Sequence, residues 1–141
     1  MQYKKLNEKS TKIFQKLISQ LDEEKRYIKF DNSDGAFMPV TVEFLYNDDL
    51  QGRIPSGKRY SVAHNYVCNG DFMRDPDVEF IYDGENVYPV YFMQDGTFHI
   101  RDDVFAYNDE GKIIGYRSSL ANGIKDFCNR WMVNIKEQQS L

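Results

Sequence analysis

The residues best suited to chemistry are gathered between Ser61 and Tyr82, in the segment SVAHNYVCNGDFMRDPDVEFIY. This segment contains one of the two histidines and a dense set of carboxylates, flanked on both sides by strand signals. No motif in it names a reaction, a cofactor or a substrate. We take these side chains as the candidate binding surface: His64, Asn69, Asp71, Asp75, Asp77 and Glu79.

A metal site is one interpretation of this segment. Carboxylates suit Mg²⁺ and Ca²⁺, and imidazole suits transition metals. The indication is weak, because carboxylates are common in turns and a histidine on an apolar strand face is more often packed in a core. We therefore assign no metal and no cofactor. A divalent-metal-dependent enzyme acting on nucleic acid or a phosphorylated substrate stays as the alternative, with ligands from His64, Asp71, Asp75 and Glu79.

Other catalytic patterns are incomplete. His99 lies near Asp95, Asp102 and Asp103 in the sequence, so an acid-base pair is conceivable. No Gly-x-Ser-x-Gly elbow or activated cysteine supplies a nucleophile. Gly52 to Lys58 fits the GxxxxGK part of a phosphate-binding loop. Arg59 stands where that loop requires Ser or Thr, and a strand rather than a helix is expected to follow.

Composition limits the partners. The chain has 141 residues with 41% apolar and 28% charged side chains, which suits one soluble domain over residues 1–141. It has no apolar run long enough to span a bilayer and no signal-like start, so we expect a cytoplasmic protein without membrane contact. The net charge of −4 argues against a general nucleic-acid binder. A protein partner is favoured, the chain itself being a monomer or a weak homodimer.

The flanking segments predict helices. Apolar residues recur at helical spacing from Lys4 to Leu21 and from Ser119 to Lys136, with Ser118 or Ser119 as the cap of the second helix. In the second helix, Gly123 is expected to permit close approach to the sheet. The first helix carries a stripe of lysines, interpreted as a solvated face, with an anion or nucleic-acid contact as the alternative. These lysines are Lys5, Lys9, Lys12 and Lys16.

The middle of the chain predicts strands by alternation of apolar and polar residues. The expected strands are Arg26–Asp31, Met38–Tyr46, Arg59–Cys68, Asp77–Tyr82, Val87–Gln94, Thr97–Ile100, Val104–Tyr107 and Lys112–Tyr116. Asn47 to Lys58 is the longest expected loop, and Asp71 to Pro76 is expected to form a compact connection. The two cysteines, Cys68 and Cys128, are expected to be reduced and buried.

These elements predict a two-layer α+β domain. Short connections require antiparallel neighbours, which gives an antiparallel sheet of six to seven strands with the N-terminal and C-terminal helices on one face. The opposite face is then partly open and rich in tyrosine. This aromatic face is a second candidate for binding, although its rings could instead simply cover the sheet.

The central segment also resembles a known sequence pattern. His64-Asn65-Tyr66, Asn69-Gly70-Asp71, Met73-Arg74-Asp75-Pro76-Asp77 and Glu79-Phe80 are similar to HYxxNGDLMxDPExxF. That pattern is associated with small uncharacterised bacterial proteins encoded on conjugative plasmids, integrative elements and phages. The resemblance covers roughly residues 61 to 96 and implies a mobile-element context, but no activity. Together these features favour a small binding or accessory protein over the metal-dependent enzyme.

Overall fold

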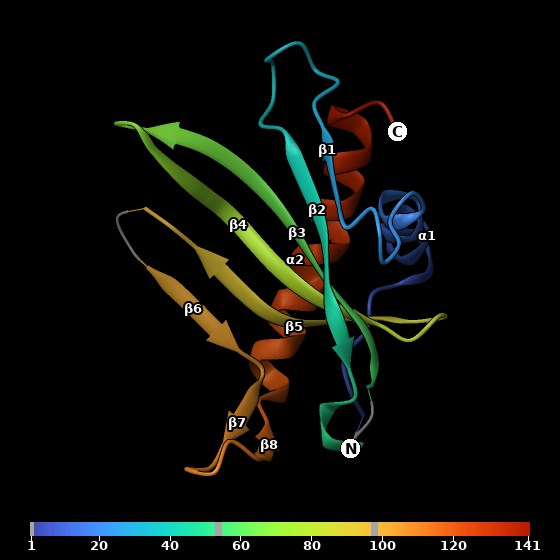
Figure 1. Ribbon diagram of the computed structural model, residues 1–141, viewed down its shortest axis with the longest axis vertical. Helices are drawn as coiled ribbons and strands as arrows, with labels where there is room; N and C mark the ends of the chain where they lie inside the picture. The colour runs from blue at the N-terminus through green and yellow to red at the C-terminus, as the bar shows by residue number, and fades with distance from the viewer. Residues whose placement is uncertain (1, 53–54, 97–98) are drawn as a thin grey trace.

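The computed structural model describes residues 2–52, 55–96 and 99–141, and it has two layers, a sheet and a pair of helices (Figure 1). In chain order the elements are α1 (Glu8–Ile18), β1 (Tyr27–Phe30), β2 (Val40–Asp48), the short 3₁₀ helix η1 (Leu50–Gly52), β3 (Gly57–Cys68), β4 (Asp71–Tyr82), β5 (Val87–Gln94), β6 (Ile100–Asp103), β7 (Phe105–Tyr107), β8 (Ile113–Tyr116) and α2 (Ser118–Gln138).

The main sheet has six strands in the order β1-β2-β3-β4-β5-β6, and every neighbouring pair is antiparallel. Strands β7 and β8 form a separate antiparallel hairpin. Sequential strands lie side by side because each connection is too short for a parallel crossover. The predicted α+β class and antiparallel sheet are confirmed.

Both helices cover the same face of the sheet. The Phe14 ring of α1 lies 5.8 Å from the Tyr60 ring of β3, centre to centre. Four residues further along β3, the His64 ring lies 5.4 Å from Trp131 of α2. Tyr60 and His64 are separated by an even number of strand positions and are buried, so they share one face. Neither helix, among the residues described, is long and apolar enough to cross a membrane.

The two helices begin differently. Asn7 caps α1, since its side-chain oxygen accepts the Ser10 backbone N–H at 2.8 Å. Helix α2 follows Arg117, which makes no side-chain capping bond, so the predicted serine cap is wrong. The prediction for Gly123 is also wrong, because a Cβ there would meet nothing within 4 Å.

The largest difference from the sequence prediction lies at β4. The strand begins directly after the Asn69-Gly70 turn, and Cys68 pairs with Asp71, so no separate connection precedes Asp77. Asn69 and Gly70 both have positive φ, at 51° and 84°, which is typical of a two-residue hairpin turn. Pro76 has no N–H to donate, and it lies within β4 where the pairing with β3 shifts register opposite His64. Cys68 lies exposed on this hairpin rather than buried.

Smaller corrections concern the loops. The predicted loop from Asn47 to Lys58 is shorter, because β2 continues to Asp48, η1 follows, and β3 starts at Gly57. Thr97 and Phe98 of the predicted strand Thr97–Ile100 lie outside the described residues, and β6 runs later, from Ile100 to Asp103.

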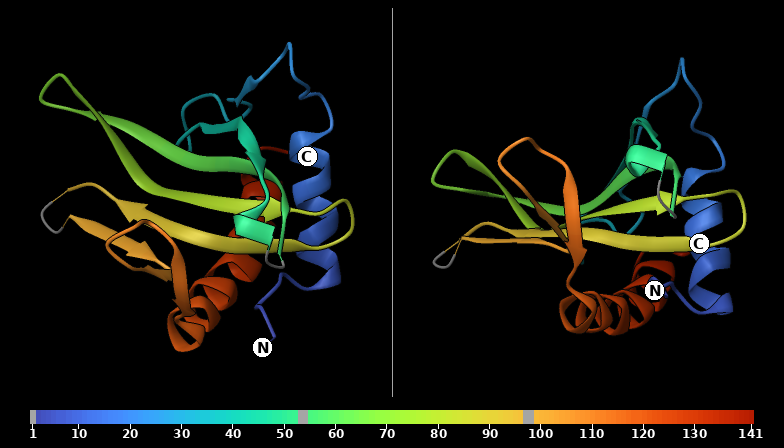
Figure 2. Two further views of the ribbon diagram at one scale, coloured as in Figure 1. Left: turned by 60° about the horizontal axis from the view of Figure 1, so that its bottom comes forward. Right: turned by 90° about the horizontal axis from the view of Figure 1, so that it is seen from below.

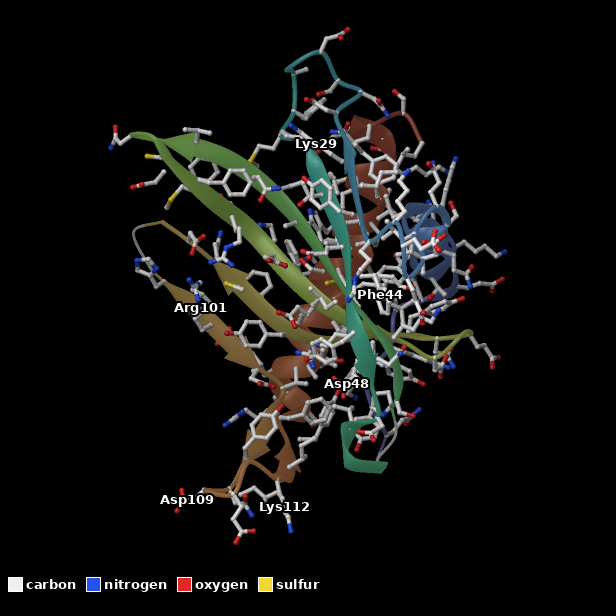
Figure 3. The ribbon with its side chains drawn as sticks, in the orientation of Figure 1. Lys29, Phe44, Asp48, Arg101, Asp109 and Lys112 are labelled. Carbon is white, nitrogen blue, oxygen red and sulfur yellow. The ribbon has the colours of Figure 1, made fainter. Side chains whose placement is uncertain are left out.

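The face of the sheet away from the helices is open over its centre. In Figure 2, right, α2 lies on one side of the sheet, while η1 and the β7–β8 hairpin rise on the other. Figure 3 looks onto this open face, with Lys29 near one edge and Arg101 near the other. Side chains at alternate positions of β2, β3 and β4 therefore point to this open face.

Candidate functional site

His64 lies on the helix side of the sheet, away from the open face. It is 7% exposed, and its Nδ1 accepts the Trp131 indole N–H at 3.4 Å. Its Nε2 is buried with no hydrogen-bond partner. Burial lowers the pKa of the imidazole, while the charge of Asp75 opposes that shift. His64 is therefore a neutral histidine of the core.

Asn69 and Asp71 lie at the end of the β3–β4 hairpin, where both are exposed. Asn69 forms the turn itself, and Asp71 opens β4. Asp75, further along β4, accepts a hydrogen bond from the Gln94 side-chain amide on β5. These three predicted site residues are spread along the length of the hairpin rather than gathered at one point.

Asp77 and Glu79 point to the open face, opposite His64. Asp77 is 9% exposed and accepts the Ser61 hydroxyl at 2.6 Å across the β3–β4 pair. Burial raises the pKa of its carboxyl, and the hydrogen bond from Ser61 only partly offsets this. The charge of Arg74 also offsets the shift in part, and Asp77 remains a buried carboxyl with a raised pKa on the floor of the open face.

Glu79 belongs to a nearly buried ionic cluster. Arg59 Nε donates to Glu79 at 2.7 Å, and Arg59 Nη1 donates to Asp48 at 3.0 Å. Burial disfavours the Arg59 charge, but the charge and hydrogen bond of Glu79, together with Tyr46 and Asp48, outweigh it and raise the pKa of the guanidinium. The Tyr46 ring lies over this guanidinium at 5.8 Å. Glu79 is therefore already paired, and Arg59 links β3 to β2 through Asp48 and to β4 through Glu79.

A hollow of about 390 Å³ opens on the sheet around Asp77. We call it the Asp77 hollow and define it by these lining residues: Tyr27, Glu43, Ser61, Phe72, Arg74 and Asp77. Thr41 and Asn65 also line it and bond to each other, Asn65 Nδ2 donating to Thr41 Oγ1 at 2.9 Å. The rings at its rim are exposed, Tyr27 by 53% and Phe72 by 66%.

Acidic side chains outnumber basic ones among the residues that line the Asp77 hollow. Glu43 and Asp77 contribute two carboxyls, and the pKa shift of Asp77 includes repulsion from Glu43. Arg74, the one cation among the described residues that line it, bonds to Asp95 through its backbone N–H and its Nε, each at 3.0 Å. The side chain of Arg74, helped by Arg101, holds the pKa of Asp95 well below its usual range. The hollow therefore presents acidic groups beneath exposed aromatic rings.

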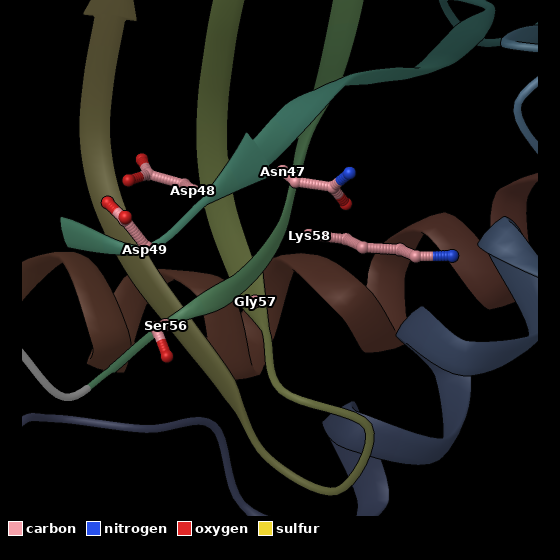
Figure 4. Close-up of a pocket in the computed structure, with 6 residues that line it drawn as sticks. All are labelled: Asn47, Asp48, Asp49, Ser56, Gly57 and Lys58. Carbon is pink, nitrogen blue, oxygen red and sulfur yellow. The ribbon is translucent and has the colours of Figure 1, made fainter. Parts of the chain in front are cut away.

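A wider hollow of about 490 Å³ lies where β2 meets β3 (Figure 4). Its lining includes Gly57 and Lys58, the end of the predicted phosphate-loop match. These residues open strand β3 rather than a helix, and the Lys58 side chain points away from Asp48 and Asp49 (Figure 4). A phosphate loop needs a helix N-terminus at this place, so the match does not form one.

The four ligands predicted for the alternative metal site do not come together in the structure. His64 lies on one face of the sheet and Glu79 on the other, while Asp71 sits at the hairpin end. Among the described residues there is no group of three or more His, Cys, Asp or Glu side chains that could hold a metal ion. His99 is exposed and outside a strand, and the Asp95 near it in sequence bonds to two arginines.

Several residues of the Asp77 hollow were absent from the predicted surface. Ser61, Glu43 and Tyr27 follow one another across β3, β2 and β1, since Glu43 pairs with both Ser61 and Tyr27. Alternation placed Ser61 and Glu43 opposite the apolar side chains of their strands. Predicting that these residues are neighbours requires the register between the strands, and the local alternation of side chains does not give that register.

The architecture and the hollow define a class, a two-layer α+β domain with an open, aromatic-rimmed sheet face. The chain belongs to the family described as Domain of unknown function (DUF6908), whose sequence model matches residues 8–141. The comparisons with curated proteins and with solved structures gave no match. The family gives no activity, so function must be argued from the surface itself.

Proposed function

We propose that this chain is a small accessory protein that binds a protein partner through the Asp77 hollow, taking up a basic side chain of that partner. The observation that carries the proposal is the combination of Asp77 and Glu43 under the exposed rings of Tyr27 and Phe72. A lysine or arginine side chain offers a cation for the carboxyls and a stem for the rings.

The state of Asp77 supports a cationic ligand. Burial raises the pKa of this carboxyl, which accepts a hydrogen bond from the hydroxyl of Ser61. A cation placed beside a buried carboxyl favours the ionised form and relieves the cost of its burial. A basic group bound beside Asp77 would therefore offset the cost of burying the ionised carboxyl, and this would add to the free energy of binding.

The exposed rings support a macromolecular partner. Tyr27, Phe72 and Val67 are each more than half exposed, and Val67 pairs with Phe72 at the end of the projecting β3–β4 hairpin. Tyr46 and Tyr107 expose 50% and 45% further along the open face. Aromatic side chains around a central polar hollow are typical of the residues that dominate protein interfaces.

The metal-dependent enzyme remains the second candidate, but the geometry favours binding. Convergence of at least three of its four ligands in one cleft would support the enzyme. Those ligands instead lie on two faces and at a hairpin end. The resemblance to mobile-element proteins and the absence of a membrane-spanning helix among the described residues support an accessory role in the cytoplasm of a bacterium carrying such an element.

Binding of short fluorescent peptides by anisotropy tests the proposal. The peptides carry a single lysine or arginine, or glutamine at that place, within the same neutral aromatic-containing sequence. The basic peptides should bind, and Asp77→Asn or Glu43→Gln should weaken them about tenfold, the loss typical of an interface anchor. Asp109→Asn, at the tip of the β7–β8 hairpin, is the charge-matched control (Figure 3).

Two results would count against this function. Equal binding of the glutamine peptide would remove the charge argument, and an equal loss in Asp109→Asn would make the effect one of net charge.

Calorimetric titration with Mg²⁺, Mn²⁺, Ca²⁺ and Zn²⁺ tests the second candidate function, the metal-dependent enzyme. Saturable binding that disappears in Asp75→Ala would favour the enzyme.

A further inference from the structure

A third hollow lies between α1 and the end of α2. It has a volume of about 260 Å³. We call it the lysine groove and define it by its lining residues: Lys9, Lys12, Ile13, Lys16, Lys136 and Leu141. In Figure 1, α2 lies behind the sheet and α1 stands end-on beside it, so the lysine groove lies away from the centre of the open face.

The charge of the groove comes from two separate helices. Lys9, Lys12 and Lys16 follow one side of α1, and Lys136 joins them from the last turn of α2. Lys12 pairs with Glu8 at 3.2 Å, but both side chains are more than two-thirds exposed, so that pair competes weakly with a ligand. Four cations thus converge in a chain whose net charge is −4.

The floor of the groove is apolar. Ile13 is 6% exposed, and Leu141 is folded back towards α1 at the end of the chain described. This fold is fixed locally, because Ser140 has φ of 55° and the Leu141 backbone N–H donates to the Lys136 carbonyl at 2.9 Å. Such a bond, five residues back, is typical of a helix end that reverses with a left-handed residue.

We propose that the lysine groove binds an acidic amphipathic segment of a partner protein. Carboxylates of the segment meet the four lysines, and an apolar side chain rests on Ile13 and Leu141. The apolar floor favours such a segment over a nucleic-acid backbone, which offers phosphates without an apolar side chain.

This inference does not rest on the Asp77 hollow. The convergence of Lys136 with the α1 lysines is a property of the folded chain, since the sequence places them more than a hundred positions apart. A lysine stripe on one helix is commonly just solvated, and the stripe alone would not support a site. The second helix and the apolar floor distinguish this groove from a solvated face.

Anisotropy with a labelled acidic peptide containing one central leucine tests the groove. Lys9→Gln, Lys16→Gln and Lys136→Gln together should weaken binding about tenfold, the effect expected from three partly screened ion pairs. Lys25→Gln, Lys29→Gln and Lys112→Gln, three exposed lysines elsewhere, form the charge-matched control and should leave binding unchanged. Leu141→Ser should weaken the leucine peptide but not a peptide with serine in its place.

Competing ligands complete the experiment. Tighter binding of single-stranded DNA or of phosphatidylserine vesicles than of the acidic peptide would overturn the proposal. So would equal loss in both triple variants, or equal affinity for the leucine and serine peptides. Sedimentation of the wild type alone tests for self-association. If the wild type associates and the triple groove variant does not, the groove binds a second copy of this chain and the proposal is overturned.

Discussion

The Ser61 hydroxyl donates to the Asp77 carboxylate at 2.6 Å, joining two strand positions sixteen residues apart in sequence. This hydrogen bond holds the buried carboxyl on the open face of the sheet, pointing away from His64 and the helices. The burial also raises the pKa of Asp77, so the carboxyl keeps its proton to a higher pH in the folded chain than in the unfolded chain.

Asp77→Asn should increase the free energy of unfolding at neutral pH. Asp77 has a folded pKa raised above its ordinary value of 3.8, so the stability contributed by its protonated form is full below 3.8 and lost as pH rises through the raised value. The uncharged amide avoids that loss and can still accept from Ser61. The gain should be of order 1 kcal/mol and should vanish in acid, as measured by urea unfolding over a pH series.

The exposed Asp109→Asn is the control for this series and should shift stability little at any pH. A variant that is less stable than the wild type at neutral pH, and equally stable in acid, would contradict the account of Asp77. It would mean that the ionised carboxyl has favourable partners in solution.

Arg59→Leu should destabilise the fold by about 3 kcal/mol, because it leaves Asp48 and Glu79 without their shared cation. The Arg59 side chain is 9% exposed, so water cannot readily replace it. Adding Asp48→Asn and Glu79→Gln to Arg59→Leu should recover much of the loss. Urea unfolding of the single and triple variants measures both effects.

The exposed pair of Lys12 and Glu8 provides the comparison for the buried cluster. Lys12→Ala should change the free energy of unfolding by less than about 0.5 kcal/mol, as exposed helix pairs do. Similar losses in Lys12→Ala and Arg59→Leu would show that burial does not govern the energetics of the Arg59 cluster.

Much of the fold could be predicted from local patterns. Alternation along Val40, Val42 and Phe44 correctly gave a strand with one buried face, because the two faces of this sheet differ in environment. Pro76 misled the prediction. A proline usually marks a strand start or an edge, whereas here the paired β3 strand accommodates it inside β4 at a register shift.

The site was harder to predict than the fold. Residue type drew attention to Asp77, which lies in the hollow, and to Glu79, which instead pairs with Arg59. Glu43, Ser61 and Tyr27 enter the hollow only through the register of the strand pairs. His64 was placed on an apolar face by alternation, and its burial under Trp131 follows that pattern. The lysine groove depends on how the ends of two helices meet, which neither helical pattern contains.

His64→Gln should flatten the dependence of stability on pH below neutrality. Burial lowers the folded pKa of His64 below its ordinary value of 6.5, so its contribution to stability is present above 6.5 and lost as pH falls from there towards the lowered value. Glutamine cannot titrate, and its oxygen can still accept from the Trp131 indole. Unfolding free energies between pH 7 and pH 5 should therefore fall less steeply in the variant.

His99→Gln changes the exposed histidine and should leave the slope of the wild type intact. If His64→Gln keeps that slope as well, other groups are responsible for the acid sensitivity and His64 is not held neutral by its burial.

Two glycine substitutions should change stability in opposite directions. A Cβ at Gly57 would lie 2.2 Å from the Tyr82 carbonyl oxygen, so Gly57→Ala forces β3 and β4 apart and should cost about 2 kcal/mol. A Cβ at Gly123 meets nothing within 4 Å, and alanine is the better helix former, so Gly123→Ala should add up to about 1 kcal/mol. Thermal and urea unfolding of the two variants measure this contrast. A stable Gly57→Ala protein would mean that the strand ends separate without cost, and a destabilised Gly123→Ala protein would mean that α2 meets a surface at that position.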